Sequence, residues 1–414
     1  MLAVASVFFG FVWPTVDFAR RVVQGYGYYV VAGTFGWAVY ALVRLWPQWW
    51  AARPPVVRRE LAHLGALIGG LTLIAALTVP YTYKVLYDEF VLQTTAWNMH
   101  EARVVGAAVR GYEIEGTFLP FGDYLDKRPY FYAFVLSLLH DVFGYREANA
   151  FALNTALMPL VLGLLYLVAR RRVGHWPGLA AVAALGAFSL FAHNGTGAGM
   201  ELLNLAMLLL VIELAAFYLA RPDDEARLAA LVLSALLLAQ ARYESGLYVL
   251  PVAIVVLEGW RRAGRIVLPL AAVLAPVLLI PYALHNTYLS GTPLLWELRA
   301  GDESRFGLRY LFANLAHARD FFFTFSSQVT NSTWLGYAGI PAFGWAAFRL
   351  LRALRAWRES RAADFAVAVF GATIAGGLGL LMFYYWGQLD DPIVARLSLP
   401  FSALLALGLA DAAS

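Results

Sequence analysis

Long apolar stretches recur along almost the whole chain, separated by short polar connections. Many approach the roughly 20 residues that a helix needs to cross the hydrocarbon core of a bilayer, and others are shorter. They occupy residues 28–46, 61–80, 147–169, 177–193, 201–220, 227–241, 246–259, 266–284, 334–351, 364–385 and 394–411. The pattern predicts an all-α polytopic membrane protein with about 10–12 transmembrane helices.

Composition excludes an ordinary soluble domain. Hydrophobic residues make up 61% of the 414 residues and charged residues only 14%, whereas soluble domains carry about 25% charged residues. The chain has no cysteine, which excludes disulfides and thiolate metal sites. The net charge of +4 does not indicate a nucleic-acid partner, because the arginines are spread over separate connections between apolar stretches.

The arginines fall in alternate connections, which sets the topology. By the positive-inside rule these basic connections face the cytoplasm: 53–59, 170–172, 221–227, 261–265 and 352–361. The remaining connections then lie outside: 81–146, 194–200, 242–245, 285–333 and 386–393. This distribution predicts a multi-pass protein of the cell (inner or plasma) membrane whose active site is extracytoplasmic.

One apolar stretch, 130–144, does not fit as a span. Arg58 and Arg170 must both be cytoplasmic, so an even number of spans separates them, and 61–80 and 147–169 already supply two. We therefore expect 130–144 to form a helix along the outer interface, packed on the bundle.

The chain divides into N-terminal membrane segments with a basic loop, 1–60, and one module, 61–414, with large outer loops 81–146 and 285–333. Residues 1–18 are apolar but precede Arg20 and Arg21 on the predicted outer side. They are interpreted as a span, a re-entrant segment or an uncleaved signal-like helix, and the sequence does not choose among these.

The first outer loop opens with Asp88 and Glu89, followed by a helical pattern over roughly 90–110. One interpretation is that Asp88 caps this helix by accepting its unpaired N–H groups. The other is that a carboxylate held at the mouth of the bundle serves as a general base. Spacing alone does not decide between them.

The same loop ends with Lys127, Arg128 and Pro129 before the aromatic stretch, and Lys127 is one of only two lysines in the chain. These cations are interpreted either as an anchor that reaches toward lipid headgroups or as a clamp for a phosphate at the lipid surface.

Other charged residues lie at the predicted outer face. Glu201 begins an apolar stretch, and Arg242, Tyr243 and Glu244 follow another. One interpretation is that Glu201 only interacts with the dipole at the start of its helix and that Arg242 only pairs with Glu244. Glu213 lies inside an apolar stretch, where we expect it to bond to a neighbouring helix.

Two further patterns carry no chemistry. Gly195, Gly197 and Gly199 mimic a nucleotide loop but follow no strand, so they predict a turn. The seven histidines show no metal-ligand spacing, so the sequence gives no support for a divalent metal.

Over 61–410 the ordered motifs resemble the glycosyltransferase C superfamily, in the branch of lipid A aminoarabinose transferases and protein O-mannosyltransferases. The motifs are Asp88-Glu89, Tyr124-Leu-Asp-Lys-Arg-Pro-Tyr-Phe-Tyr132, Phe143-Gly144, Ala169-Arg-Arg171, Glu201, Arg242-Tyr-Glu-Ser-Gly246, His285 to Pro293, and Arg396-Leu-Ser-Leu-Pro400. The chain departs from the family pattern where Arg128 replaces a proline, at the N-terminus, where apolar segments are added, and at the C-terminus, where no soluble domain follows. These departures bear on the lipid-phosphate site and on the acceptor.

The resemblance implies a bundle of this superfamily's type that transfers a sugar from a polyprenyl-phosphate donor to an acceptor lipid, protein or glycan, with inversion. Asp88 would be the general base, and Lys127, with Arg128 or Arg242, would steady the phosphate. The resemblance also implies that Tyr130 and Tyr132 line the polyprenyl groove and that Glu201 contacts the acceptor. Glu89 and Tyr243 complete the implied substrate-binding residues. Residues 285–333 would form the second wall of the cavity, and the sugar stays open.

Two alternatives remain. A polysaccharide ligase or polymerase would place its key cations in a late loop, and Arg299, Arg305, Arg309 and His317 lie there. A transporter or non-enzymatic subunit would show helices broken near the midplane and inverted repeats.

Overall fold

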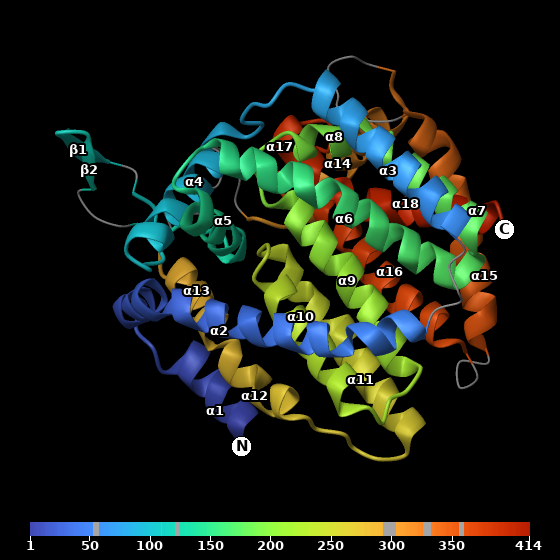
Figure 1. Ribbon diagram of the computed structural model, residues 1–414, viewed down its shortest axis with the longest axis horizontal. Helices are drawn as coiled ribbons and strands as arrows, with labels where there is room; N and C mark the ends of the chain where they lie inside the picture. The colour runs from blue at the N-terminus through green and yellow to red at the C-terminus, as the bar shows by residue number, and fades with distance from the viewer. Residues whose placement is uncertain (53–57, 109, 121–123, 293–303, 326–332, 356–359) are drawn as a thin grey trace.

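The computed structural model describes residues 1–52, 58–108, 110–120, 124–292, 304–325, 333–355 and 360–414. Helices dominate these residues (Figure 1), and each apolar stretch found in the sequence contains helix. Seven helical segments of the described residues are long and apolar enough to cross a bilayer. They are α2 (Val16–Ala51), α3 (Arg58–Thr78), α6 (Ala148–Val173), α9 (Glu201–Leu219), α12–α13 (Leu270–Leu278 and Ile280–Ser290), α16 (Ala362–Leu381) and the run Pro392–Ala412. The all-α polytopic membrane fold is confirmed.

By length and composition, seven segments of the described residues qualify as spans, where the sequence predicted about 10–12 transmembrane helices. Helices α7 (His175–Gly186) and α8 (Ser189–Gly195) are bent by 69° at a short break, so they add at most one span. The other apolar stretches form helices of 14 or 15 residues: α10 (Glu225–Ala239), α11 (Val249–Ala263), preceded by the 3₁₀ turn η2 (Glu244–Tyr248), and α15 (Ile340–Ala353), preceded by the π turn η5 (Leu335–Gly339). The runs 227–241 and 246–259 were themselves no longer than the helices α10 and α11 that they form, so these short helices match the sequence pattern.

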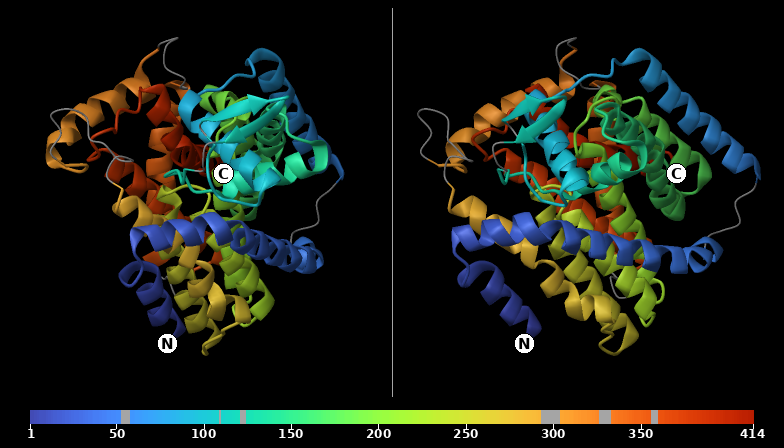
Figure 2. Two further views of the ribbon diagram at one scale, coloured as in Figure 1. Left: turned by 90° about the vertical axis from the view of Figure 1, so that its left-hand side faces the viewer. Right: turned by 60° about the vertical axis from the view of Figure 1, so that its left-hand side comes forward.

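The N-terminal segments differ from their predicted bounds. The expected start of a span at residue 28 is wrong, because α2 begins at Val16, where the side chain of Thr15 accepts the Phe18 N–H at 3.3 Å. Residues 1–18 form no single span: α1 (Leu2–Val7) and the π turn η1 (Phe8–Val12) are short and fold back beside α12 and α13 (Figure 2). Gly10 permits this close approach, since a Cβ there would lie 2.7 Å from the Ala283 Cβ.

The first large loop holds two helices and a hairpin. Helix α4 (Leu86–Glu101) begins before the predicted 90–110, and strands β1 (Gly111–Ile114) and β2 (Thr117–Pro120), which the sequence pattern did not predict, pair antiparallel and project from the bundle (Figure 1). Helix α5 (Phe131–Phe143) confirms the helix expected at 130–144. Its 13 residues rise only about 20 Å, less than the roughly 30 Å of a hydrocarbon core.

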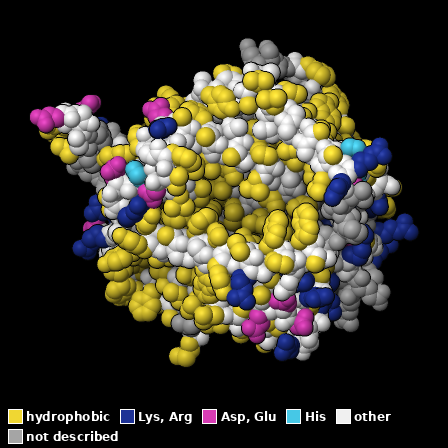
Figure 3. Space-filling model, in the orientation of Figure 1, with side chains coloured by type: hydrophobic (Ala, Val, Ile, Leu, Met, Phe, Trp, Pro, Cys, Tyr) yellow, Lys and Arg dark blue, Asp and Glu magenta, His cyan; other side chains and the backbone are white. Residues whose placement is uncertain are grey.

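The central helix α9 is buried along nearly its whole length. Near one end of the bundle, three consecutive arginines of α6 form ion pairs with acidic side chains of four other helices. The N···O distances are 2.8 Å for Arg170–Glu60, 2.5 Å for Arg171–Glu213, 3.1 Å for Arg172–Asp364 and 2.6 Å for Arg172–Asp411. The expected bond from Glu213 to a neighbouring helix is thereby confirmed. Outside, hydrophobic side chains cover most of the face in Figure 3, and charged ones gather toward its margins, as a lipid-facing surface requires.

Candidate active site

Charged side chains from several distant parts of the chain meet in one continuous cluster at the end of the bundle where α9 begins. Carboxylates and guanidiniums alternate along it in the order Asp126, Arg128, Asp88, Arg396, Glu201, Arg242 and Glu244. We call this set the charge cluster. Such buried pairing is required because an isolated buried charge is costly.

Asp88 lies in the first turn of α4 and accepts hydrogen bonds from Arg128 and Arg396, one on each carboxylate oxygen. Its side chain is 18% exposed. It does not cap α4, because the cap position is Val85 and the N–H groups of Lys84 and Val85 donate to Glu89. Burial raises the pKa of Asp88, but the two guanidiniums outweigh burial and hold this pKa below its ordinary value, so Asp88 is ionised.

Arg128 is buried between two carboxylates. It donates to Asp126 through a side-chain nitrogen and, at 3.0 Å, through its backbone N–H. Burial alone would lower the pKa of Arg128, whereas Asp126 and Asp88 raise it above its ordinary value. The backbone oxygen of Asp126 in turn lies 2.7 Å from Nε2 of His285 on α13. These contacts fix the segment before α5 against α4 and α13.

Arg396 is the central cation of the charge cluster, and it was not among the site residues predicted from the sequence. It stands in the 3₁₀ turn η7 (Arg396–Ser398), between α17 (Pro392–Ala395) and α18 (Leu399–Ala412). One Nη donates to Asp88 and the other to Glu201 at 2.8 Å, while Nε donates to the Ile393 oxygen at 2.9 Å. Its sequence signal was an arginine within an apolar stretch, which is functional or paired by default.

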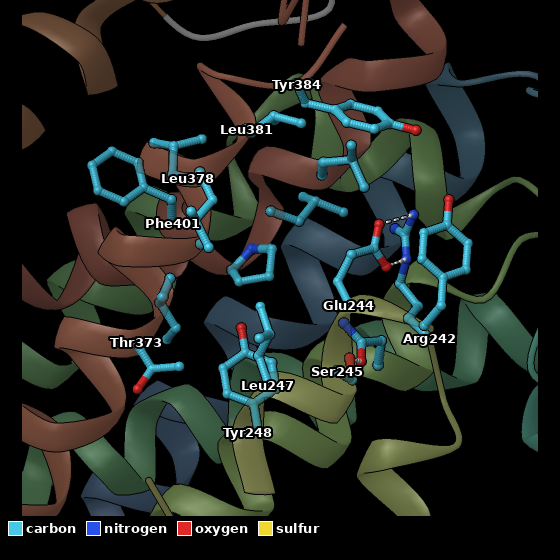
Figure 4. A pocket seen from close by; sticks show the side chains of 18 of the residues that line it. Arg242, Glu244, Ser245, Leu247, Tyr248, Thr373, Leu378, Leu381, Tyr384 and Phe401 are labelled. Carbon is cyan, nitrogen blue, oxygen red and sulfur yellow. Dashed lines mark hydrogen bonds and ion pairs between the residues drawn. The ribbon is translucent and has the colours of Figure 1, made fainter. Parts of the chain in front are cut away.

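Arg242 continues the charge cluster from the connection between α10 and η2. It donates to Glu201 at 3.3 Å and, through Nε, to Glu244 at 3.1 Å. Burial alone would lower the pKa of Arg242, but Glu244 and Glu201 raise it. Glu244 is 38% exposed at its side chain, and Figure 4 shows the Arg242–Glu244 pair on one side of a pocket.

A cavity of about 430 Å³ opens beside the charge cluster, between α9, η2, α16 and the start of α18. Its charged lining residues are Arg242, Arg396, Glu201 and Glu244, which belong to the charge cluster, together with Arg305. Its other walls are mainly apolar, and include Leu247, Tyr248, Ile374, Gly377, Leu378, Leu381, Leu397 and Phe401 (Figure 4). The cavity thus combines charged residues with mainly apolar walls.

Arg305 belongs to a segment that is fixed against the cavity by backbone bonds. The Tyr385 N–H donates to the Arg305 oxygen at 2.9 Å, and the Gly307 N–H donates to the Phe383 oxygen at 2.9 Å. The segment leads through η4 (Leu308–Tyr310) into α14 (Leu311–Phe323). Part of the late outer loop therefore does form a wall of the cavity; 293–303 and 326–332 lie outside the described residues.

The structure separates the predicted site residues into groups. Glu201, Arg242 and Tyr243 line the cavity, and Asp88 joins them through Arg396. Lys127 is half-buried and is not among the residues that line the cavity; burial and Arg128 lower its pKa. Tyr130 and Tyr132, expected along the polyprenyl groove, are instead packed in the core. Glu89 is buried next to Asp88 in the chain, and its carboxylate accepts the backbone N–H groups of Lys84 and Ala198.

The late-loop cations that the structure describes, on which the ligase alternative depends, do not gather at one site. Arg305 lines the cavity, but Arg309 donates to Tyr310 at 2.7 Å and His317 pairs with Asp390 at 2.8 Å, both away from the lining. Arg299 lies outside the described residues. Within the part of the chain that the structure describes, no group of three His, Asp or Glu side chains is arranged to hold a metal ion.

A model of the family described as dolichyl-phosphate-mannose-protein mannosyltransferase matches residues 127–285. This match covers less than half of the chain and agrees with the resemblance to the glycosyltransferase C superfamily. No curated protein sequence matches the chain.

Two solved structures are similar to this chain. One is ArnT from Cupriavidus metallidurans bound to undecaprenyl phosphate, at 15% identity and a TM-score of 0.49, over 85% of this chain and 60% of that chain. The other is the oligosaccharyltransferase AglB from Archaeoglobus fulgidus with an inhibitory peptide and a dolichol-phosphate, at 12% identity and a TM-score of 0.48, over 85% of this chain and 50% of that one. The chain therefore spans 60% or less of the length of these proteins.

Proposed function

We propose that this protein transfers a sugar from a polyprenyl-phosphate donor to an acceptor on the extracytoplasmic face of the membrane. The observation that carries the proposal is the cavity, whose lining combines three arginines, Arg242, Arg305 and Arg396, with mainly apolar walls. A polyprenyl phosphate has two matching parts, an anionic head and a long apolar chain.

The phosphate would face the arginines of the cavity. Guanidiniums suit this role, because they stay charged and donate planar pairs of hydrogen bonds to phosphate oxygens. The apolar chain would follow the wall formed by α16, where Gly377, Leu378 and Leu381 lie. Charge grows on the phosphate as the glycosidic bond breaks, so positioned cations stabilise the transition state more than the bound donor.

Asp88 would act as the base. The acceptor hydroxyl or amine attacks the anomeric carbon and passes its proton to the Asp88 carboxylate. The bond from that carbon to the phosphate oxygen breaks, and the electron pair leaves with the polyprenyl phosphate. Because Arg128 and Arg396 lower the pKa of Asp88, the carboxylate is ready to accept a proton but is a weak base, so transfer would come late, when the attacking group has become acidic.

Two features support the outer location of this site. The cavity lies at the end of the bundle where α9 begins at Glu201, α16 ends at Leu381 and Arg396 precedes α18. The arginine triplet of α6 binds Glu213, Asp364 and Asp411, which lie farther toward the other ends of α9, α16 and α18. Under the positive-inside rule the triplet marks the cytoplasmic side.

The test is Asp88→Asn in purified protein, assayed with a polyprenyl-phosphate sugar. We expect transfer to fall by about 10²–10⁴-fold, with binding of polyprenyl phosphate retained. Asp141→Asn is the matched control, because Asp141 of α5 pairs with His100 of α4 and with Arg103 just after α4, and none of the three lines the cavity. Full activity of the Asp88 variant would refute the assignment. Mass spectrometry of lipid that co-purifies with the protein would identify the donor.

A further inference from the structure

Glu89 follows the proposed base but is bound to a different set of partners. Its side chain is buried, and it accepts three backbone N–H groups from two separate parts of the chain. Lys84 and Val85 donate to Oε2 at 2.5 and 3.2 Å, and Ala198 donates to Oε1 at 2.9 Å. One carboxylate therefore joins the start of α4 to the turn that precedes α9.

That turn is shaped around two carboxylates. A Cβ at Gly199 would lie 2.2 Å from Oε2 of Glu201 and 3.4 Å from Oε1 of Glu89, and a Cβ at Gly197 would lie 3.0 Å from the same Glu89 oxygen. On its other side, Asn154 of α6 donates to the Gly197 and Gly199 oxygens, each at 2.9 Å. The glycines, which as a sequence pattern indicated only a turn, leave the room that Glu89 and Glu201 occupy.

The two segments joined by Glu89 carry the two carboxylates that hold Arg396. Asp88 is its neighbour on α4, and Glu201 follows the turn at the head of α9. We infer that Glu89 is a positioning residue, which sets the spacing between Asp88 and Glu201 and thereby aims Arg396 at a phosphate in the cavity. This inference rests on the proposed function of that cavity.

Glu89 joins the two segments as a carboxylate, although its surroundings disfavour a charge there. The ammonium of Lys84 donates to the Pro80 oxygen at 2.7 Å and to Thr82 at 3.2 Å. Burial raises the pKa of Glu89, the Ala198 N–H opposes this, and the nearby Glu201 raises it further. A second carboxylate so close to Glu201 is unfavourable, but an apolar residue could not accept N–H groups from both segments.

The first variant is Glu89→Gln, which keeps the size of the side chain. Its amide has one oxygen and one NH₂ group, so it can accept from one segment but presents a donor to the other. Thr95→Val is the control on the same helix, because the buried Thr95 hydroxyl bonds only within α4, to the Val91 oxygen at 2.8 Å. Gly199→Ala is the second variant, since it displaces the same turn without changing any charge.

The experiment measures affinity for a polyprenyl phosphate in detergent, far below the unfolding temperature, together with kcat and KM for transfer. We expect E89Q and G199A each to weaken binding by about tenfold or more, as small displacements of positioned groups do, and T95V to bind as the wild type does. In the double variant the losses should not multiply, because both substitutions disturb the packing of the same turn against Glu89 and Glu201.

Three outcomes would count against the inference. Wild-type affinity in E89Q, with only a lower unfolding temperature, overturns it in favour of a purely structural role. Losses that multiply in the double variant overturn it as well, and if E89Q does not fold, wild-type affinity in G199A does so. Failure of the wild-type protein itself to bind polyprenyl phosphate would instead refute the proposed function and, with it, this role.

Discussion

Removing either member of the Asp88–Arg396 pair breaks the same ion pair, yet the two losses should differ in their effect on stability. The charge cluster contains one more carboxylate than guanidinium. Asp88→Asn makes the two numbers equal, whereas Arg396→Gln leaves two carboxylates in excess. The arginine variant should therefore be the less stable of the two.

The structure sets the size of each effect. In Asp88→Asn the guanidiniums keep Asp126 and Glu201 as partners, so the cost is that of weakened hydrogen bonds to charged groups, about 1.5–3 kcal/mol. In Arg396→Gln, Glu201, whose side chain is only 2% exposed, keeps one cation at 3.3 Å. Leaving a buried charge poorly compensated costs about 3–5 kcal/mol.

The assay is thermal unfolding of both variants in one detergent at pH 7. A difference of about 2 kcal/mol corresponds to roughly 2–4 °C in Tm for a chain of this size. Asp141→Asn, outside the charge cluster, serves as the reference for a lost surface ion pair. If Asp88→Asn unfolds at the same temperature as Arg396→Gln or below it, the charge argument is wrong.

Three further predictions concern Lys127, the apolar wall of the cavity and the buried His140. Lys127→Ala should weaken binding of polyprenyl phosphate in a direct binding assay; unchanged binding would favour the anchor interpretation. Gly377→Leu should lower affinity for long-chain more than short-chain polyprenyl phosphates, because Gly377 lines the cavity and a Cβ there meets no atom within 4 Å. Burial and His100 lower the pKa of His140 to about 4, so its unfolded form, with a pKa of about 6.5, binds the proton more readily. Stability should fall as pH drops from 7 to 5, and His140→Phe should flatten this dependence in thermal unfolding.

Sequence pattern predicted the helical membrane fold and much of the site because both depend on local signals. Apolar runs mark helices wherever they pack, and the parity of arginine loops separated α5 from the spans. Asp88, Glu201 and Arg242 were recognisable as charges beside apolar stretches, and the structure brings all three into one charge cluster. Family resemblance supplied the role of Asp88, which neither spacing nor charge could assign.

The parts that sequence reasoning missed depend on contacts between distant segments. Arg396 lies 308 residues from Asp88, and no local pattern indicates that the two meet. Lys127 attracted attention as a rare lysine, whereas the described cavity is lined by arginines. Tyr130 and Tyr132 have the aromatic character of a lipid groove, but packing against the bundle places both in the core. Helix breaks, such as the 69° bend between α7 and α8, leave the apolar pattern almost unchanged.

The position of Arg396 between cavity and base explains why the site needs an arginine there. Arg396 lines the cavity, while Asp88 is not among the lining residues and reaches the cavity through it. A donor phosphate in the cavity and a proton moving to Asp88 would therefore act on opposite sides of one guanidinium. Its fixed fork of N–H groups can hold Asp88 and Glu201 and still face an anion, whereas a single ammonium cannot span both carboxylates in fixed geometry. The reacting carbon would then lie beside Arg396, where departing phosphate and attacking acceptor are both within reach of the charge cluster.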